Sequence, residues 1–181
     1  MLLESNNCLL LIVDLQEKLL RKIKVRSLII DNTIKLIKSF HIFGIPIIIT
    51  EQYSKGLGPT DSKIKGCFDK FSPMEKTSFS CLKEIKISRK ISSYKKKQLI
   101  ICGIESHICI LQTAFDLVNL NYFPYVVTDG VSAIKEENNF WAIHRLQQQK
   151  NISLVTAEMV IFELLKDSKN DHFKHISNLI K

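Results

Sequence analysis

Residues Leu99 to Leu117, LIICGIESHICILQTAFDL, join an apolar run, a glycine and an amphipathic stretch. The run Leu99 to Cys102 is typical of a strand buried on both faces, and from Ile108 onward apolar residues recur at helical spacing. Cys109 therefore falls in the first turn of a predicted helix. Unpaired N–H groups and the positive end of the helix dipole lie there, and both favour a thiolate over a thiol. A buried packing cysteine is the alternative.

Short apolar runs and longer amphipathic stretches alternate along the rest of the chain. The runs that we expect to be strands are Cys8 to Val13, Pro46 to Thr50, Leu99 to Cys102, Tyr125 to Thr128 and Ser153 to Val155. The stretches that we expect to be helices lie near Ser27 to Phe43, Ile108 to Asn121, Glu136 to Lys150 and Ala157 to Leu165. Apolar strands joined by helices form parallel sheets covered on both sides. The sequence thus predicts one three-layer α/β/α domain over residues 1–181, with a Rossmann-like parallel sheet flanked by helices.

The composition is that of a globular protein, because 45% of the 181 residues are hydrophobic and 24% are charged. The apolar run Cys8 to Val13 is far too short to span a membrane, and no basic segment precedes it. The five cysteines form an odd set without a CxxC pair, which argues against a disulfide framework. These features predict a cytoplasmic protein with no membrane partner.

The formal net charge of +8 raises the question of a nucleic-acid partner. The lysines are scattered over the faces of predicted helices. The one compact run, Lys95 to Lys97, has no interleaved aromatic residues on which bases would stack. Solvated helix faces account for this pattern, so we expect no nucleic-acid partner.

Charged residues mark the carboxyl ends of the predicted strands, where the ligand sites of open α/β sheets lie. Asp14 directly follows the apolar run LLLIV, with helix capping as its alternative role. Lys76 lies in EKTSFS near the end of a long irregular stretch, Glu51 to Ser80, and an exposed lysine is the alternative there. Asp14, Lys76 and Cys109 together supply a proton acceptor, a cation and a nucleophile.

These motifs resemble the isochorismatase-like cysteine hydrolase superfamily, in which an aspartate ends the first strand, a lysine follows a long loop and a cysteine opens a helix. They stand here as Asp14 in LLLIVDLQEK, Lys76 in EKTSFS and Cys109 in CGIESHICILQTAFDL. The loop TEQYSKGLGPT, Thr50 to Thr60, and the later VVTDGVSA are similar to the branch of isochorismatase domain-containing proteins. The resemblance covers nearly the whole chain. It implies a cysteine-dependent hydrolase that cleaves an amide-type C–N bond of a small molecule through a thioester.

The resemblance also implies roles for individual residues. Asp14 accepts the thiol proton, Lys76 stabilises the resulting charges, and Cys109 attacks the carbonyl. The backbone N–H groups of Glu105 and Cys109 are the expected oxyanion hole, with a non-proline cis peptide between Ile104 and Glu105. Residues that flank the catalytic positions are candidates for substrate binding, with a structural loop role as the alternative: Glu51, Gln52, Tyr53 and Phe79.

The chain departs from the nicotinamidase branch, which carries an Asp-x-His and a further metal-binding His after the second strand. Glu51, Gln52 and Tyr53 stand at this place, so we expect neither a metal nor another cofactor. The resemblance and the apolar helices imply a homo-oligomer. A rival interpretation is a non-hydrolytic, oligomeric binding or scaffolding protein that keeps Asp14, Lys76 and Cys109 without a physiological reaction.

Overall fold

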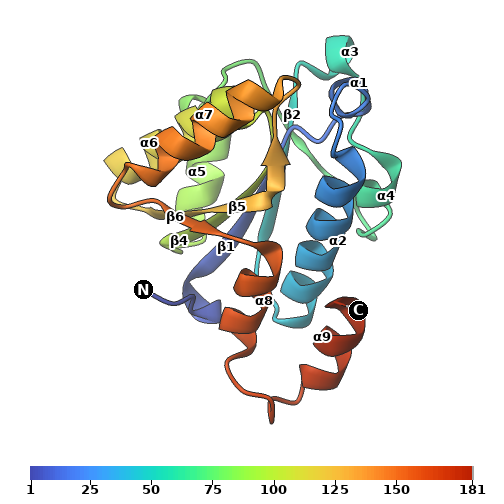
Figure 1. The fold of residues 1–181 in the computed structure, drawn as a ribbon, viewed down its shortest axis with the longest axis vertical. Coiled ribbons are helices and arrows are strands. Elements are labelled where there is room, and N and C mark those ends of the chain that lie inside the picture. Colours follow the sequence, from blue (N-terminus) through green and yellow to red (C-terminus); the bar gives the residue numbers. More distant parts are fainter. Residues whose placement is uncertain (181) are drawn as a thin grey trace.

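The computed structural model describes residues 1–180, which form a parallel sheet with helices on both faces (Figure 1). The strand order is β3-β2-β1-β4-β5-β6, and each neighbouring pair is parallel. The predicted three-layer α/β/α architecture is confirmed. The strands are β1 (Cys8–Val13), β2 (Ile47–Gln52), β3 (Met74–Lys76), β4 (Gln98–Ile104), β5 (Phe123–Ser132) and β6 (Ser153–Val155).

The central strands β1 and β4 are apolar along their length because helices cover them on both sides, and every residue of both strands is buried. Successive side chains of β1 point to opposite faces: Leu10 packs into one core cluster and Leu11 into the other. Val13 pairs with Gly103 at the carboxyl end of the two strands. Gly103 has φ +124°, and a Cβ built there would lie 2.0 Å from the Val13 carbonyl oxygen, so this close approach requires glycine.

The helices divide between the two faces of the sheet (Figure 1). Helices α2 (Arg26–Ile42), α8 (Ala157–Leu165) and α9 (Phe173–Ile180) pack on one face. Helices α5 (Ile85–Ser93), α6 (Leu111–Asn119) and α7 (Glu136–Gln147) pack on the other. The short elements are η1 (Ser5–Asn7), α1 (Glu17–Leu20), α3 (Ser54–Leu57), α4 (Ser62–Lys65), η2 (Cys81–Lys83) and the π-helical turn η3 (Ser106–Ile110).

The stretch Glu51 to Ser80, expected to be irregular, contains the end of β2, the helices α3 and α4, and the edge strand β3. Elements this short do not reveal a hydrophobic period, which is why the sequence does not indicate them. The predicted helix Ile108 to Asn121 also has other bounds in the structure. Its first residues belong to the π-helical turn η3, and the α-helix that follows, α6, ends at Asn119. Helices α5 and α9 were not predicted. No helix within residues 1–180 is long and apolar enough to cross a bilayer.

Candidate active site

The carboxyl ends of the parallel strands bring Asp14, Lys76 and Cys109 into one buried cluster. Lys76 Nζ lies 2.6 Å from Asp14 Oδ2 and 3.5 Å from Cys109 Sγ. The exposed fractions of the three residues are 1%, 1% and 6% for Asp14, Lys76 and Cys109. The three residues selected from the sequence are therefore neighbours in space, although their separation in the chain reaches far beyond any local motif.

Asp14 reaches the cluster through an unusual backbone conformation. Its φ is +54°, in the left-handed region that aspartate tolerates better than most residues. Its N–H donates to the Thr50 carbonyl oxygen at 3.2 Å, and its Oδ1 accepts a hydrogen bond of 2.7 Å from Thr50 Oγ1. Helix α1 has Gln16 at its N-cap and no side-chain capping bond. Asp14 is thus oriented toward Thr50 and Lys76, and the capping alternative is excluded.

Lys76 is the last residue of β3, and its ammonium group is surrounded by acceptors. Nζ donates to Gln52 Oε1 at 2.6 Å and to the carbonyl oxygens of Ser78 and Phe79, both at 3.2 Å. Burial acts to lower the pKa of Lys76, but the charges of Asp14 and Cys109 outweigh it and the pKa is raised. Lys76 is consequently a buried cation, and the alternative of an exposed lysine is excluded.

The loop that supplies two of these acceptors is anchored by Glu84. One carboxylate oxygen of Glu84 accepts hydrogen bonds from the backbone N–H groups of Thr77 and Ser78, at 2.9 and 3.0 Å. These bonds stabilise the charged carboxylate and lower the pKa of Glu84 to about 2. The anchor orders the chain directly after Lys76.

Cys109 lies in the turn η3, which follows β4. The peptide bond between Ile104 and Glu105 is cis, as expected from the resemblance. The Glu105 carboxylate accepts a 2.8 Å hydrogen bond from the Ile134 N–H, so it connects this turn to the segment between β5 and α7. The turn places Cys109 Sγ opposite Lys76 Nζ.

Burial opposes the effect that the position at a helix start has on the acidity of Cys109. Burial and the nearby Asp14 charge raise the pKa of the thiol to about 12, and Lys76 only partly opposes them. Burial also raises the pKa of Asp14, with Lys76 acting against it. Desolvation thus outweighs the effect of the helix terminus, which favours the thiolate, and the sulfur keeps its proton until a base removes it. Attack by sulfur therefore requires a base, and Asp14 is adjacent.

A cavity of about 120 Å³ opens onto the cluster. Of the residues predicted to bind substrate, Gln52 and Phe79 line it. Glu105 lines it as well, beside the proposed oxyanion position. The full lining comprises Asp14, Leu19, Gln52, Leu57, Phe79, Ile104, Glu105, Ile108 and Cys109. The sequence analysis did not select four apolar members as pocket residues: Leu19, Leu57, Ile104 and Ile108. The helical pattern of QEKLLRK is a signal that could have found Leu19.

Glu51 and Tyr53 are not brought to this cavity. Glu51 Oε1 accepts hydrogen bonds from the N–H and the hydroxyl of Thr60, at 2.8 and 2.7 Å. These bonds stabilise the loop that follows β2. Tyr53 has an exposed fraction of 54%. Their placement fits the loop role that the sequence left open for them.

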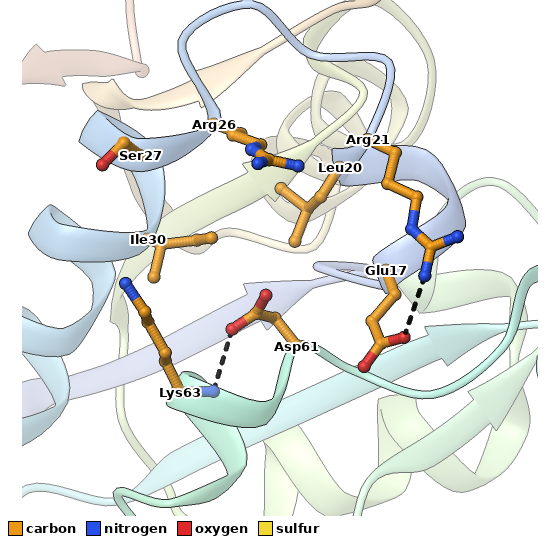
Figure 2. A pocket seen from close by; sticks show the side chains of 8 residues that line it. All are labelled: Glu17, Leu20, Arg21, Arg26, Ser27, Ile30, Asp61 and Lys63. Carbon is orange, nitrogen blue, oxygen red and sulfur yellow. Dashed lines mark hydrogen bonds and ion pairs between the residues drawn. The ribbon is translucent and has the colours of Figure 1, made fainter.

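A second hollow, of about 390 Å³, lies on the other side of α1 (Figure 2). Leu20 lines this hollow, whereas the preceding residue, Leu19, lines the cavity beside Cys109. Figure 2 shows charged side chains around it, with Arg21 directed toward Glu17. Its lining contains neither cysteine nor histidine, whereas Cys109 lines the smaller cavity.

The donor groups for a metal ion are not assembled in the part of the chain that the structure describes. Within residues 1–180 no group of three or more His, Cys, Asp or Glu side chains is arranged to hold one. Glu51, which stands near the metal position of nicotinamidases, is instead bonded to Thr60.

Comparison with known proteins places this geometry in context. The chain matches the family model of the Isochorismatase domain over residues 8–159. It is 36% identical over 178 residues to isochorismatase domain-containing protein 2 of Danio rerio, covering 98% of this chain and 89% of that protein. It is 32% identical over 157 residues to the secreted isochorismatase effector Isc1 of Phytophthora sojae, covering 84% and 74% of the two chains.

A solved structure is similar over almost the full length. The MAR1 ribonuclease from Caenorhabditis elegans superimposes with a TM-score of 0.92 at 34% identity, covering 99% of this chain and 92% of that one. The six-stranded arrangement described above is thus shared with a relative of clear sequence similarity.

Proposed function

Because the chain belongs to the isochorismatase family of hydrolases, we propose that it hydrolyses a C–N bond of a small-molecule amide, with Cys109 as the nucleophile. The observation that carries this proposal is the buried cluster of Asp14, Lys76 and Cys109 at the end of a cavity. A nucleophile, a base and a fixed cation are the groups that acyl transfer requires.

The first half of the reaction forms the acyl-enzyme. Asp14 takes the proton from Cys109 Sγ, and Lys76 stabilises the negative charge while it resides on oxygen or sulfur. The sulfur attacks the carbonyl carbon, and the carbonyl electron pair moves to oxygen. The backbone N–H groups of Glu105 and Cys109 are the proposed donors to this oxyanion. The tetrahedral intermediate then collapses, the C–N bond breaks, and the leaving nitrogen receives the proton held by Asp14.

The second half restores the enzyme. Asp14, again a carboxylate, removes a proton from water, and the hydroxide attacks the thioester carbon. The C–S bond breaks, the sulfur regains a proton from Asp14, and the carboxylic acid leaves. The same carboxylate thus serves as base and acid in both halves, which suits a group whose pKa is raised by burial.

The electrostatics of the cluster favour catalysis over the rival scaffolding role. A buried ion pair is a weak source of stability, since desolvation cancels much of the attraction. A binding protein has no need for a buried Asp14–Lys76 pair beside a thiol. The arrangement is useful when a proton must move to and from Cys109.

The Caenorhabditis elegans relative is named a ribonuclease, so RNA is a second substrate to consider. A phosphodiester is anionic, and Lys76 already has Asp14, Gln52 and two carbonyl oxygens as partners. The cavity beside Cys109 is also small. These features support an amide and our proposal that no nucleic acid is bound.

We also propose a cytoplasmic site of action. All five cysteines are free thiols, which suits a reducing compartment. Fractionation of cells that express the tagged protein tests this, and recovery in the medium, where the Phytophthora effector is named as secreted, would contradict it.

Turnover of a panel of small amides, followed by release of amine, tests the proposed function. Cys109→Ala should reduce kcat/KM on any active amide by about 10³-fold or more. Cys67→Ser is the matched control, because Cys67 is half-buried and lies outside the cavity. A single-stranded RNA substrate is run in parallel. Amide turnover that survives in Cys109→Ala, or RNA cleavage that disappears with Cys109, would overturn the proposal.

A further inference from the structure

We propose that the substrate is a small, uncharged amide with an apolar acyl group, an inference that rests on the function proposed above. Three features of the cavity carry it: its size, its walls and its electrostatics.

The size of the cavity limits the acyl group. Its volume of about 120 Å³ is well below the roughly 300–1,000 Å³ of pockets that hold drug-sized ligands. Phe79 forms part of the lining with an exposed fraction of 54%, so it stands where the cavity meets solvent. An acyl group of a few heavy atoms fits inside, and a larger one must displace Phe79.

The walls of the cavity are apolar. Leu19 comes from α1, Leu57 from α3, Ile104 from the end of β4 and Ile108 from η3. These side chains meet from separate elements and offer no hydrogen-bonding group to an acyl chain. A polar acyl group would lose its hydration against these four side chains without compensation, whereas an apolar one gains from burial.

The two charged residues in the lining of the cavity are both acidic. Asp14 and Glu105 are carboxylates in the lining, and Glu105 forms no ion pair within residues 1–180. Lys76 is bonded to Asp14 and to uncharged acceptors. Lys18, next to Leu19, donates to the Gly56 carbonyl oxygen at 2.8 Å. A substrate carboxylate would therefore meet like charge in a lining that contains no cationic residue.

Three cationic side chains lie on the other side of α1. The hollow in Figure 2 is lined by Arg21, Arg26 and Lys63, and Arg21 is 3.8 Å from Glu17. None of these three residues lines the cavity beside Cys109. These three cations therefore do not meet a substrate carboxylate at Cys109, which supports a neutral substrate.

The test uses iodoacetamide and iodoacetate, which are similar in size and differ in charge. Each alkylates a thiol, forming a C–S bond and releasing iodide, and peptide mass spectrometry reports the rate at Cys109. The ratio of the two rates is divided by the same ratio for Cys67 and for N-acetylcysteine in solution. The second reference is needed because Lys38 lies near Cys67. We expect the normalised preference for iodoacetamide at Cys109 to be about 10-fold or more.

A charge-introducing variant makes the test sharper. Leu57→Arg places a cation in the lining and should lower the preference for iodoacetamide by about 10-fold, whereas Leu57→Met, the control for side-chain size, should keep the wild-type ratio. Equal normalised rates for the two reagents in the wild type would overturn the proposal. So would a Leu57→Arg variant with an unchanged ratio.

Turnover separates failure of this inference from failure of the proposed function. Butyramide and succinamate have similar lengths, and only the second carries a carboxylate. Hydrolysis of both with equal kcat/KM, lost in Cys109→Ala, would overturn the charge selectivity and leave the proposed function standing. Strong discrimination between the two alkylating reagents without hydrolysis of any amide would support the neutral cavity and overturn the proposed function.

Discussion

Lys76 Nζ and Asp14 Oδ2 lie 2.6 Å apart, and both side chains are shielded from solvent by the protein. The same ammonium lies 3.5 Å from Cys109 Sγ. The cation therefore contacts both the proposed proton acceptor and the proposed nucleophile. When a proton moves from Cys109 to Asp14, the negative charge moves from the carboxylate to the sulfur and stays next to Lys76. The electrostatic cost of the transfer is therefore small, because the total charge near Lys76 does not change.

Asp14→Asn should uncouple thiol acidity from turnover. The Asp14 charge helps to hold the pKa of Cys109 at about 12, and the variant removes that charge while Lys76 remains. The thiol pKa should fall, so at any pH below the wild-type pKa a larger fraction of Cys109 is thiolate and iodoacetamide labels it faster. Turnover should nevertheless drop by about 10³-fold or more, since no acceptor or donor of protons remains. Slower labelling of Cys109 in this variant, with unchanged labelling of Cys67, would contradict the assignment.

Lys76→Met should destabilise the fold by about 3–5 kcal/mol, because it leaves the Asp14 carboxylate buried without its cation. The double variant Asp14→Asn/Lys76→Met should recover part of this loss, since neither charge is then unpaired. Urea unfolding of the wild type, both single variants and the double variant measures the coupling. Strictly additive free energies of unfolding would show that the two residues do not interact as described.

Removal of metal ions should leave activity unchanged. Glu51, which follows the second strand where the sequence of nicotinamidases carries metal-binding residues, is bonded to Thr60, and no suitable donor cluster exists within residues 1–180. Dialysis against a chelator, followed by elemental analysis and assay, checks this. A stoichiometric metal whose loss abolishes turnover, and whose return restores it, would refute the expectation.

We expect the protein to form a homo-oligomer, with the outer face of α7 as one contact. Phe140 and Trp141 have exposed fractions of 63% and 58%, and their rings pack edge to face with centroids 5.2 Å apart. Light scattering at micromolar concentration should give a multiple of the chain mass, and Phe140→Ser/Trp141→Ser should lower it. A monomeric wild-type protein would contradict the expectation. An unchanged mass in the variant would show that the contact does not involve Phe140 and Trp141.

Much of the fold could be predicted from the sequence where apolar periodicity is strong. The bounds of β1, β6 and α8 agree with the predicted ranges, because these segments pack directly into the core. The edge strand β3 could not be predicted, since Met74–Lys76 is too short to show a period and depends on pairing with β2. The burial of Lys76 therefore depends on a tertiary contact that no local pattern encodes.

The candidate site shows the same limit. The predicted second strand ended at Thr50, whereas β2 continues to Gln52. Side chains alternate along a strand, so Thr50 and Gln52 face the catalytic groups and Glu51 faces the loop held by Thr60. Because the predicted strand stopped at Thr50, the sequence did not indicate that the side chains of Glu51 and Gln52 point in opposite directions. The raised pKa of the Cys109 thiol could not be predicted for a related reason, because burial is a property of the whole fold.

The most direct test of the central claim is the mass of the intact protein shortly after mixing with a small neutral acyl donor such as p-nitrophenyl acetate. The account predicts a transient gain of one acetyl group, located on Cys109 by peptide mapping, which decays as water hydrolyses the thioester. The adduct should be absent in Cys109→Ala and unchanged in Cys67→Ser. Turnover of the ester without any adduct on Cys109, or an equal adduct in Cys109→Ala, would contradict the account.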